Sequence, residues 1–327
     1  MKRRLLLAAP LVAAPALLAP GFAAAQAWPA RPVTLIVPFA AGGNVDTVAR
    51  LVAAELTRRL GQSVVVENAP GAGGTIGTER AARAAPDGHT LLVGVESPFT
   101  ISPFVTPGAV RYDPLRDFAP VGMIASLPLT LVGRNDLPAP DFSELVRVAR
   151  MSADGLTYAT SGTGTSLHLF GELIAQRSGA RLEHVPYRIA AQIPTDLLAG
   201  RLDLAVLTVT TTAPLIRDGR IRGYAVSSAA PHPGIPAVPP LARFPGFEGF
   251  EMLAWQGLFG PAQLDPAIIR RLSEELAGML ADDGFRQRLD AVGMTPWTRT
   301  PAQLTAVVRG DLDRYREVVR AGNIRAE

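Results

Sequence analysis

The sequence predicts an α/β fold with two lobes, each built on a mostly parallel sheet flanked by helices. Short apolar runs such as Val33–Val37 and Thr90–Val95 alternate with longer segments whose apolar residues recur at helical spacing. Continuous β-branched runs separated by amphipathic helices are typical of parallel strands buried on both faces. The chain has 327 residues with 48% hydrophobic content, which is enough for a large core divided between two lobes.

Individual elements follow from apolar spacing and from their end signals. Apolar residues at helical spacing run from 45 to 60, and Gly61 marks the end of that helix. Asp265 and Pro266 suit the N-cap and first position of a later helix. Strands are expected at 33–37, 64–66, 90–95, 129–132, 156–159, 183–185, 202–207, 222–226 and 255–259. Helices are expected at 45–60, 75–85, 142–151, 167–178, 190–198, 213–218, from 266 onward and at about 301–320.

The first 27 residues have the pattern of a cleaved signal peptide. Basic residues 2–4 precede an apolar stretch over 5–22, and cleavage is expected after Ala25 or Ala27. Three prolines in the stretch argue against a stable membrane-spanning helix. Export to the periplasm is therefore expected, by the Sec route or, given Arg3 and Arg4, by the twin-arginine route.

Composition excludes several function classes. The formal net charge of +3 includes Lys2, Arg3 and Arg4, so it falls to zero once these are removed. No electrostatic case for binding nucleic acid or an anionic membrane remains. Lys2 is the only lysine, which excludes a Schiff-base or P-loop lysine from the exported protein. Cysteine is absent, so disulfides, thiolate metal sites and a cysteine nucleophile are excluded.

The chain lacks a long flexible linker between its halves. Two lobes joined by several chain crossings explain this better than two domains in series. We expect the first lobe to comprise 28–126 plus 253–327, and the second lobe to comprise 127–252.

Three glycine-rich turns between a strand and a helix are the candidate binding elements. They span 38–46, 67–77 and 158–168, two in the first lobe and one in the second. Each is expected to place backbone N–H groups at a helix N-terminus, beyond the carboxyl end of a parallel strand, where open α/β sheets bind ligands. Because a helix N-terminus carries partial positive charge, a carboxylate is the expected guest.

The same segments carry a family resemblance. Residues 28–43 read Trp-Pro-Ala-Arg-Pro-Val-Thr-Leu-Ile-Val-Pro-Phe-Ala-Ala-Gly-Gly, and 66–74 read Val-Glu-Asn-Ala-Pro-Gly-Ala-Gly-Gly. With Asp46 and with later segments in the same order, they resemble the receptors of tripartite tricarboxylate transporters, the Bug-type solute-binding proteins. The later matching segments are 85–92, 112–114, 117–121, 158–168, 184–187, 196–200 and 255–258.

The resemblance implies a type II periplasmic binding protein fold with a ligand cleft between the lobes. It implies a monomer without catalysis, cofactor or metal, which captures a small carboxylate and delivers it to the small and large membrane subunits of a transporter. Transferred position by position, the ligand contacts would be Ala40, Ala41, Gly42, Gly43, Asp46, Ala72, Gly73 and Gly74 in the first lobe, and Ser161, Thr163, Gly164, Thr165, His168, Tyr187 and Asp203 in the second.

The sequence departs from the family pattern beside the expected cleft. Ala69 stands where the family usually has arginine, and Arg188-Ile189 replaces a common lysine and glycine. The identity of the solute therefore stays open among dicarboxylates, tricarboxylates, amino acids and aromatic acids.

Two other functions are compatible with parts of the sequence, whereas hydrolysis and metal binding are disfavoured. Gly71, Gly73 and Gly77 followed by Glu96 approximate a dinucleotide fingerprint, so an exported NAD(P) oxidoreductase is one alternative. A ligand sensor for a signalling system is another. Hydrolysis is disfavoured because Ser161 is not in a G-x-S-x-G turn. His168 and Glu172 are four residues apart, but no third metal ligand is evident.

Overall fold

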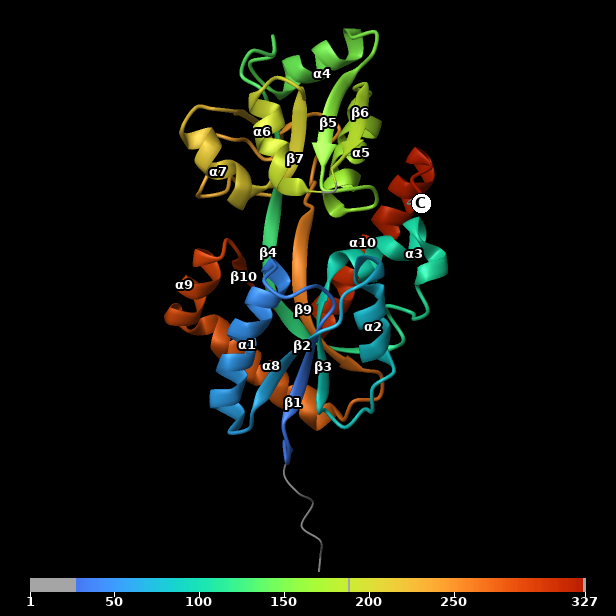
Figure 1. Ribbon diagram of the computed structural model, residues 1–327, viewed down its shortest axis with the longest axis vertical. Helices are drawn as coiled ribbons and strands as arrows, with labels where there is room; N and C mark the ends of the chain where they lie inside the picture. The colour runs from blue at the N-terminus through green and yellow to red at the C-terminus, as the bar shows by residue number, and fades with distance from the viewer. Residues whose placement is uncertain (1–27, 188, 326–327) are drawn as a thin grey trace, which may run out of the picture.

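Two lobes stand end to end in the computed structural model, which describes residues 28–187 and 189–325 (Figure 1). The prediction of an α/β fold with two lobes is confirmed. The expected signal peptide over 1–27 and Arg188 lie outside the described residues. Within 28–187 and 189–325, no helix has both the length and the apolar character needed to cross a membrane.

The first lobe is organised around three parallel strands in the order β2–β1–β3. Alternating apolar side chains of these strands, such as Leu35 and Val93, pack against the apolar faces of α1 and α8, including Leu56 and Leu276. The strands are β1 (Val33–Val37), β2 (Val64–Asn68) and β3 (Thr90–Val95). The helices are α1 (Asn44–Leu60), α2 (Thr75–Ala82), α3 (Ser102–Val105), α8 (Pro266–Ala281) and α9 (Asp283–Ala291).

The second lobe repeats the arrangement with the parallel order β6–β5–β7. Its core contains Tyr158, Phe170 and Leu204, all almost fully buried. The strands are β5 (Leu156–Thr160), β6 (Leu182–Pro186), β7 (Leu204–Thr208) and β8 (Arg222–Val226). The helices are α4 (Phe142–Met151), α5 (Ser166–Ser178), α6 (Ile193–Leu198) and α7 (Val209–Arg217). Single turns of other helix types, in both lobes, occupy η1 (Ala72–Gly74), η2 (Ser97–Ile101), η3 (Pro107–Ala109), η4 (Ala190–Gln192) and η5 (Leu241–Arg243).

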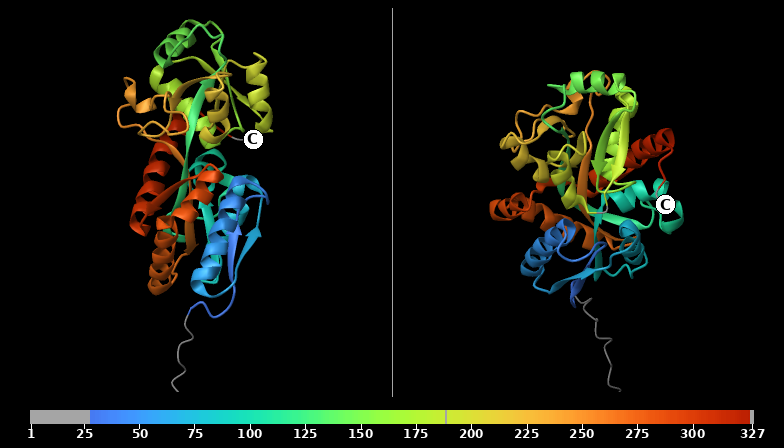
Figure 2. Two further views of the ribbon diagram at one scale, coloured as in Figure 1. Left: turned by 90° about the vertical axis from the view of Figure 1, so that its left-hand side faces the viewer. Right: turned by 45° about the horizontal axis from the view of Figure 1, so that its top comes forward.

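Two long strands cross between the lobes, as Figures 1 and 2 show. Strand β4 (Phe118–Gly133) pairs antiparallel with β9 (Leu253–Pro261) along its first part, and with β7 and β8 from Leu129 onward. Strand β10 (Thr295–Arg299) also pairs with β4. The sheet is therefore continuous through both lobes, in the order β2–β1–β3–β9–β4–β7–β5–β6.

The last helix, α10 (Pro301–Gly322), also reaches both lobes. Thr300 and Gln303 form a capping box at its start, where Leu304 packs with first-lobe residues. Near its end, Tyr315 and Val318 contribute to the core of the second lobe. The C-terminal part of α10, which was expected in the first lobe, thus packs in the core of the second lobe.

Candidate functional site

The first predicted loop, at the carboxyl end of β1, is held by a buried carboxylate. The Asp46 Oδ2 accepts hydrogen bonds from Gly42 N at 2.8 Å and Arg50 Nε at 2.9 Å. The Asp46 Oδ1 accepts one from Asn68 Nδ2 at 2.9 Å, and the same amide donates to the Phe39 carbonyl. The loop is therefore tied both to α1 and to the end of β2.

Asp46 has little capacity left for a ligand. It is only 3% exposed, and both its oxygens have protein donors. The hydrogen bond from Arg50 and those from the other donors outweigh burial, which lowers the pKa of Asp46 to about 2. The carboxylate is therefore charged at neutral pH. This geometry favours a role in holding the loop over the direct ligand contact predicted from the sequence.

Replacing Asp46 by alanine is expected to weaken binding of all cleft ligands to a similar degree. The change removes the acceptor for Gly42 N and Asn68 Nδ2, so the loop loses its anchor, and unfolding should become easier by about 1–3 kcal/mol. Titration calorimetry with pairs of ligands that differ by one amino or hydroxyl group checks this. A loss confined to ligands carrying that group would instead show direct contact.

The second loop, at the carboxyl end of β2, lies against the first. Gly74 packs on the ring of Phe39 so closely that an added Cβ would lie 3.0 Å from the nearest ring carbon. Ala72, Gly73 and Gly74 all have positive φ angles, of 46°, 64° and 97°. A Cβ at Gly73 would meet nothing within 4 Å. Gly73 therefore borders open space beside the first loop.

The third loop comes from the second lobe and reaches the first. Thr165 caps α5 by accepting from His168 N at 3.2 Å. Gly164 lies against Val105 of α3, since a Cβ there would be 2.6 Å from Val105 Cγ1. One residue into α5, Ser166 Oγ donates to Glu96 Oε1 at 3.0 Å. The loops of the two lobes thus approach each other at the carboxyl ends of β3 and β5.

Backbone donors are available on both sides of this approach. Ala41, Gly43 and Thr163 are exposed, and within residues 28–187 and 189–325 their N–H groups donate to no protein acceptor. The N–H groups of Gly162 and Gly164 are instead used within the third loop, by Thr160 Oγ1 and His168 Nδ1.

A pocket of about 160 Å³ lies at the base of this region. None of the fifteen residues predicted from the sequence lines it, although their neighbours Phe39 and Asn44 do. The remaining lining residues are Val45, Val95, Glu96, Ser97, Leu127, Ala254, Trp255, Gln256 and Met294. Most of these residues lie at the start of α1, at the carboxyl end of β3 and at the start of β9.

Two polar side chains of the pocket were not among the residues predicted from the sequence. Gln256 is 4% exposed and donates to Asn44 Oδ1 at 2.7 Å, while its Oε1 has no hydrogen-bond partner among the described residues. Glu96 accepts from Ser166 Oγ and from Trp255 N at 3.2 Å. Burial raises the pKa of Glu96 to about 7. Its position directly after a buried strand was the available signal.

His168 supports the third loop from beneath. Its Nδ1 accepts from Gly164 N at 3.1 Å, and its ring stacks on His184 with centroids 3.8 Å apart. Its Nε2 lies 3.7 Å from Glu172 Oε1. Burial lowers the pKa of His184 to about 4, so that ring is neutral at pH 7. His168 is itself 5% exposed and is positioned to shape the loop rather than to face solvent.

Tyr187 and Asp203 have other partners. The Tyr187 hydroxyl donates to Asp196 Oδ2 at 2.7 Å. The Asp203 Oδ2 accepts from the backbone N and the hydroxyl of Thr157, and its Oδ1 accepts from Arg134. Asp203 precedes β7 and lies beside the amino end of β5, whereas the third loop follows the carboxyl end of β5. The structure therefore does not bring Asp203 to the other predicted residues.

The dinucleotide alternative fits this geometry poorly. The acid expected to bind a ribose, Glu96, is fully engaged with Ser166 and Trp255. Gly77 packs on the main chain, where a Cβ would lie 2.6 Å from the Ala69 carbonyl oxygen. In the described part of the chain, no group of three or more His, Asp and Glu residues is placed to hold a metal ion.

Comparison with known proteins identifies relatives along nearly the whole described chain. The family model for the tripartite tricarboxylate transporter family receptor matches residues 48–324. BugT of Bordetella pertussis is 33% identical over 297 residues, covering 90% of each chain. A Pseudomonas sp. strain P51 protein, encoded between tcbD and tcbE, is 36% identical over 294 residues, covering 90% of this chain and 87% of the relative.

Solved structures agree with this match. The periplasmic binding protein BugD is 33% identical, with a TM-score of 0.72, and the match covers 92% of this chain and all of that one. MatC from Rhodopseudomonas palustris with bound malate has the same identity and TM-score, with coverage of 89% and 100%. A second Rhodopseudomonas palustris protein, with adipate, is 32% identical, with a TM-score of 0.75 and coverage of 91% and 99%.

Proposed function

Because the chain belongs to the tripartite tricarboxylate transporter receptor family, we propose that it is a periplasmic receptor for a small carboxylate-bearing solute. It would hand the loaded form to the small and large membrane subunits of a transporter, acting as a monomer. The proposal involves no catalytic step. Malate and adipate, found with two relatives, are both small dicarboxylates, which supports this ligand class.

Exposed backbone N–H groups on loops of both lobes carry the proposal. Ala41 and Gly43 of the first lobe and Thr163 of the second have donors that no protein acceptor uses in the described residues. A carboxylate placed between the lobes can replace its hydration shell with such donors, as anions do at helix N-termini. Among the fifteen residues expected from the sequence, exposed loop residues would face the solute, and side chains such as Asp46 and His168 would hold the loops. Asp203, at the amino end of β5, would take no part.

The proposed mechanism is a shift between open and closed arrangements of the lobes. The solute first binds to the loops of one lobe, and closure then adds donors from the other. Only contacts that are stronger in the closed form favour closure. The Gln256 Oε1, which has no hydrogen-bond partner among the described residues, offers an acceptor for a hydroxyl or ammonium group on the solute.

A thermal-shift screen of the purified protein tests the proposed function. Malate, adipate, succinate, citrate and benzoate form the panel, and the matching amides, which lack the carboxylate charge, are the controls. A ligand present at about 100 times its Kd should stabilise the protein by about 2.7 kcal/mol and raise the melting temperature by several degrees. If no carboxylate raised the midpoint more than its amide did, the receptor proposal would be wrong.

A further inference from the structure

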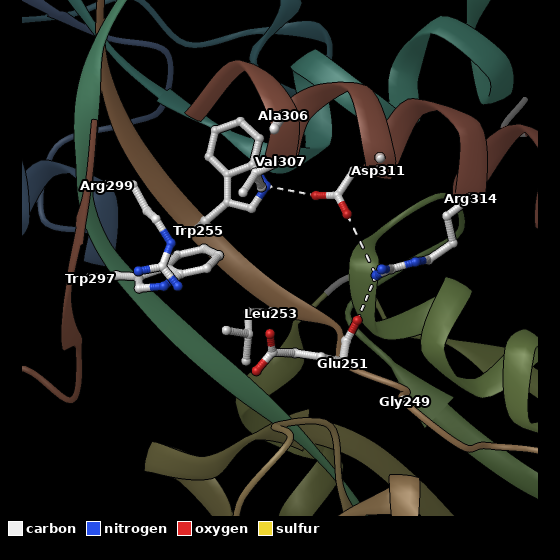
Figure 3. A pocket seen from close by; sticks show the side chains of 11 residues that line it. Gly249, Glu251, Leu253, Trp255, Trp297, Arg299, Ala306, Val307, Asp311 and Arg314 are labelled. Carbon is white, nitrogen blue, oxygen red and sulfur yellow. Dashed lines mark hydrogen bonds and ion pairs between the residues drawn. The ribbon is translucent and has the colours of Figure 1, made fainter. Parts of the chain in front are cut away.

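A second pocket lies behind the crossing strands, on the face of β9 away from the loops. Side chains alternate between the two faces of a strand, so Leu253 and Trp255 share one face while Ala254 and Gln256 share the other. Ala254 and Gln256 line the 160 Å³ pocket, Leu253 lines a separate pocket of about 440 Å³ (Figure 3), and Trp255 lines both. The second pocket is the larger of the two.

The walls of this 440 Å³ pocket, which we call the hinge pocket, come from both lobes. Glu251 belongs to the segment that leads from the second lobe into β9. Trp297 and Arg299 come from β10 of the first lobe, and Val307 comes from α10. Leu253 forms part of the apolar wall.

Two of its charged residues neutralise each other. Asp311 accepts from Trp255 Nε1 at 2.9 Å, and its Oδ1 lies 3.5 Å from Arg314 Nη1. The same Arg314 nitrogen donates to the Glu251 carbonyl at 2.7 Å. Asp311 and Arg314 are therefore occupied in fixing α10 to the start of β9.

Two opposite charges remain uncommitted. Arg299 lies with its guanidinium carbon 5.0 Å from the centroid of Trp297 and donates only to the neighbouring Thr298 carbonyl, without an ion pair in the described residues. The Glu251 carboxylate accepts one long hydrogen bond, from Ala229 N at 3.3 Å, and likewise forms no ion pair in that part of the chain. Figure 3 shows the Arg299 guanidinium over the ring of Trp297 and the Glu251 carboxylate beside Leu253.

We propose that the hinge pocket is a second ligand site, which binds a small zwitterionic amino acid with an apolar side chain. Its carboxylate pairs with Arg299 in the charge-assisted geometry that a guanidinium favours, and its ammonium pairs with Glu251. Its side chain packs on Leu253, Trp297 and Val307. Such a ligand joins the two lobes from the side opposite the loops.

Titration calorimetry of the full chain with L-alanine, L-leucine and L-phenylalanine tests the site, with Trp297 fluorescence as a second readout. We expect at least one of them to bind. For that ligand, Arg299→Gln and Glu251→Gln should each weaken binding roughly tenfold or more. Analogues lacking the amine or the carboxylate, such as 4-methylpentanoate and 3-methylbutylamine for leucine, should lose binding to a similar degree.

Arg309→Gln, which removes an exposed arginine of α10 outside the pocket, is the matched control and should bind as the wild type does. All four proteins should melt at similar temperatures, since the changed side chains are not in the core. Absence of binding by all three amino acids would overturn the proposal. Equal binding by the Arg299→Gln variant, or competition with a carboxylate identified in the thermal-shift screen, would also overturn it.

Discussion

Glu96→Gln is expected to remove a loss of stability that the wild-type protein undergoes as the pH rises from about 5 to 8. Burial raises the pKa of Glu96 from 4.5 to about 7, so the native state keeps the proton over a range in which the unfolded chain has released it. The unfolding free energy of the wild type must then fall as pH rises through this window, in total by about 3 kcal/mol. Below pH 4.5 the group is protonated in both states and has no effect.

Urea unfolding at pH 5, 6, 7 and 8 measures this difference. The glutamine carbonyl can accept from Trp255 N, and its NH2 group can donate to Ser166 Oγ, so the variant should match the wild type at pH 5 and exceed it at pH 8. Asp311, whose pKa burial raises to about 6, contributes in the same direction in both proteins and cancels in the comparison. Ser166→Ala, which keeps the carboxyl, should retain the pH dependence. Equal slopes for wild type and Glu96→Gln would contradict the assignment.

The second large effect concerns the loop after β2. Gly73→Val is expected to abolish carboxylate binding while leaving the fold intact. A Cβ added at position 73 would have no other protein atom within 4 Å, so the valine side chain would project into the space beside the first loop. The φ of +64° costs a β-branched residue about 1–2 kcal/mol, too little to unfold a domain of this size.

Gly61→Val is the matched control for this change. Gly61 ends α1 with a φ of +69° and likewise has nothing within 4 Å of an added Cβ, but it precedes β2 rather than following it. Both variants therefore carry similar backbone strain, and only Gly73→Val should lose the calorimetric binding signal of a carboxylate found in the screen. Retained affinity in Gly73→Val would mean that this loop does not contact the solute.

Regular periodicity made most elements predictable. The strands at Val33–Val37, Thr90–Val95 and Arg222–Val226 and the helix at Phe142–Met151 have the predicted bounds. Strand β4 was predicted only from residue 129 to 132, because Pro120 and Pro128 are residues that normally exclude a strand interior. In the structure, β4 runs through both prolines, with a register shift between Pro120 and Gly122. The short, highly charged helix α9 and strand β10 lacked a clear apolar period.

The sequence predicted which loops form the candidate site, but not the hydrogen-bond partners of the side chains in and around them. Glycine turns after strands indicate where backbone donors gather, whereas the partners of Asp46 and Asp203 depend on tertiary neighbours. The strand expected at 202–207 included Asp203. In the structure β7 begins at Leu204, so Asp203 lies just before the amino end of β7. Glu96 was considered only as a ribose-binding acid. Its contact with Ser166, seventy residues later, joins two lobes and leaves no local sequence signal.

The path of β4 has a mechanical consequence. Between Ser126 and Pro128 it pairs with β9 in unbroken register, and one residue later it is already part of the second lobe. A change in the angle between the lobes would therefore twist the pair of strands β4 and β9 while their hydrogen bonds stay closed. Ribbons of this kind twist readily because strain is shared among many backbone dihedrals. The change in angle would thus be spread over many residues of the two strands and would not be centred on a single hinge residue.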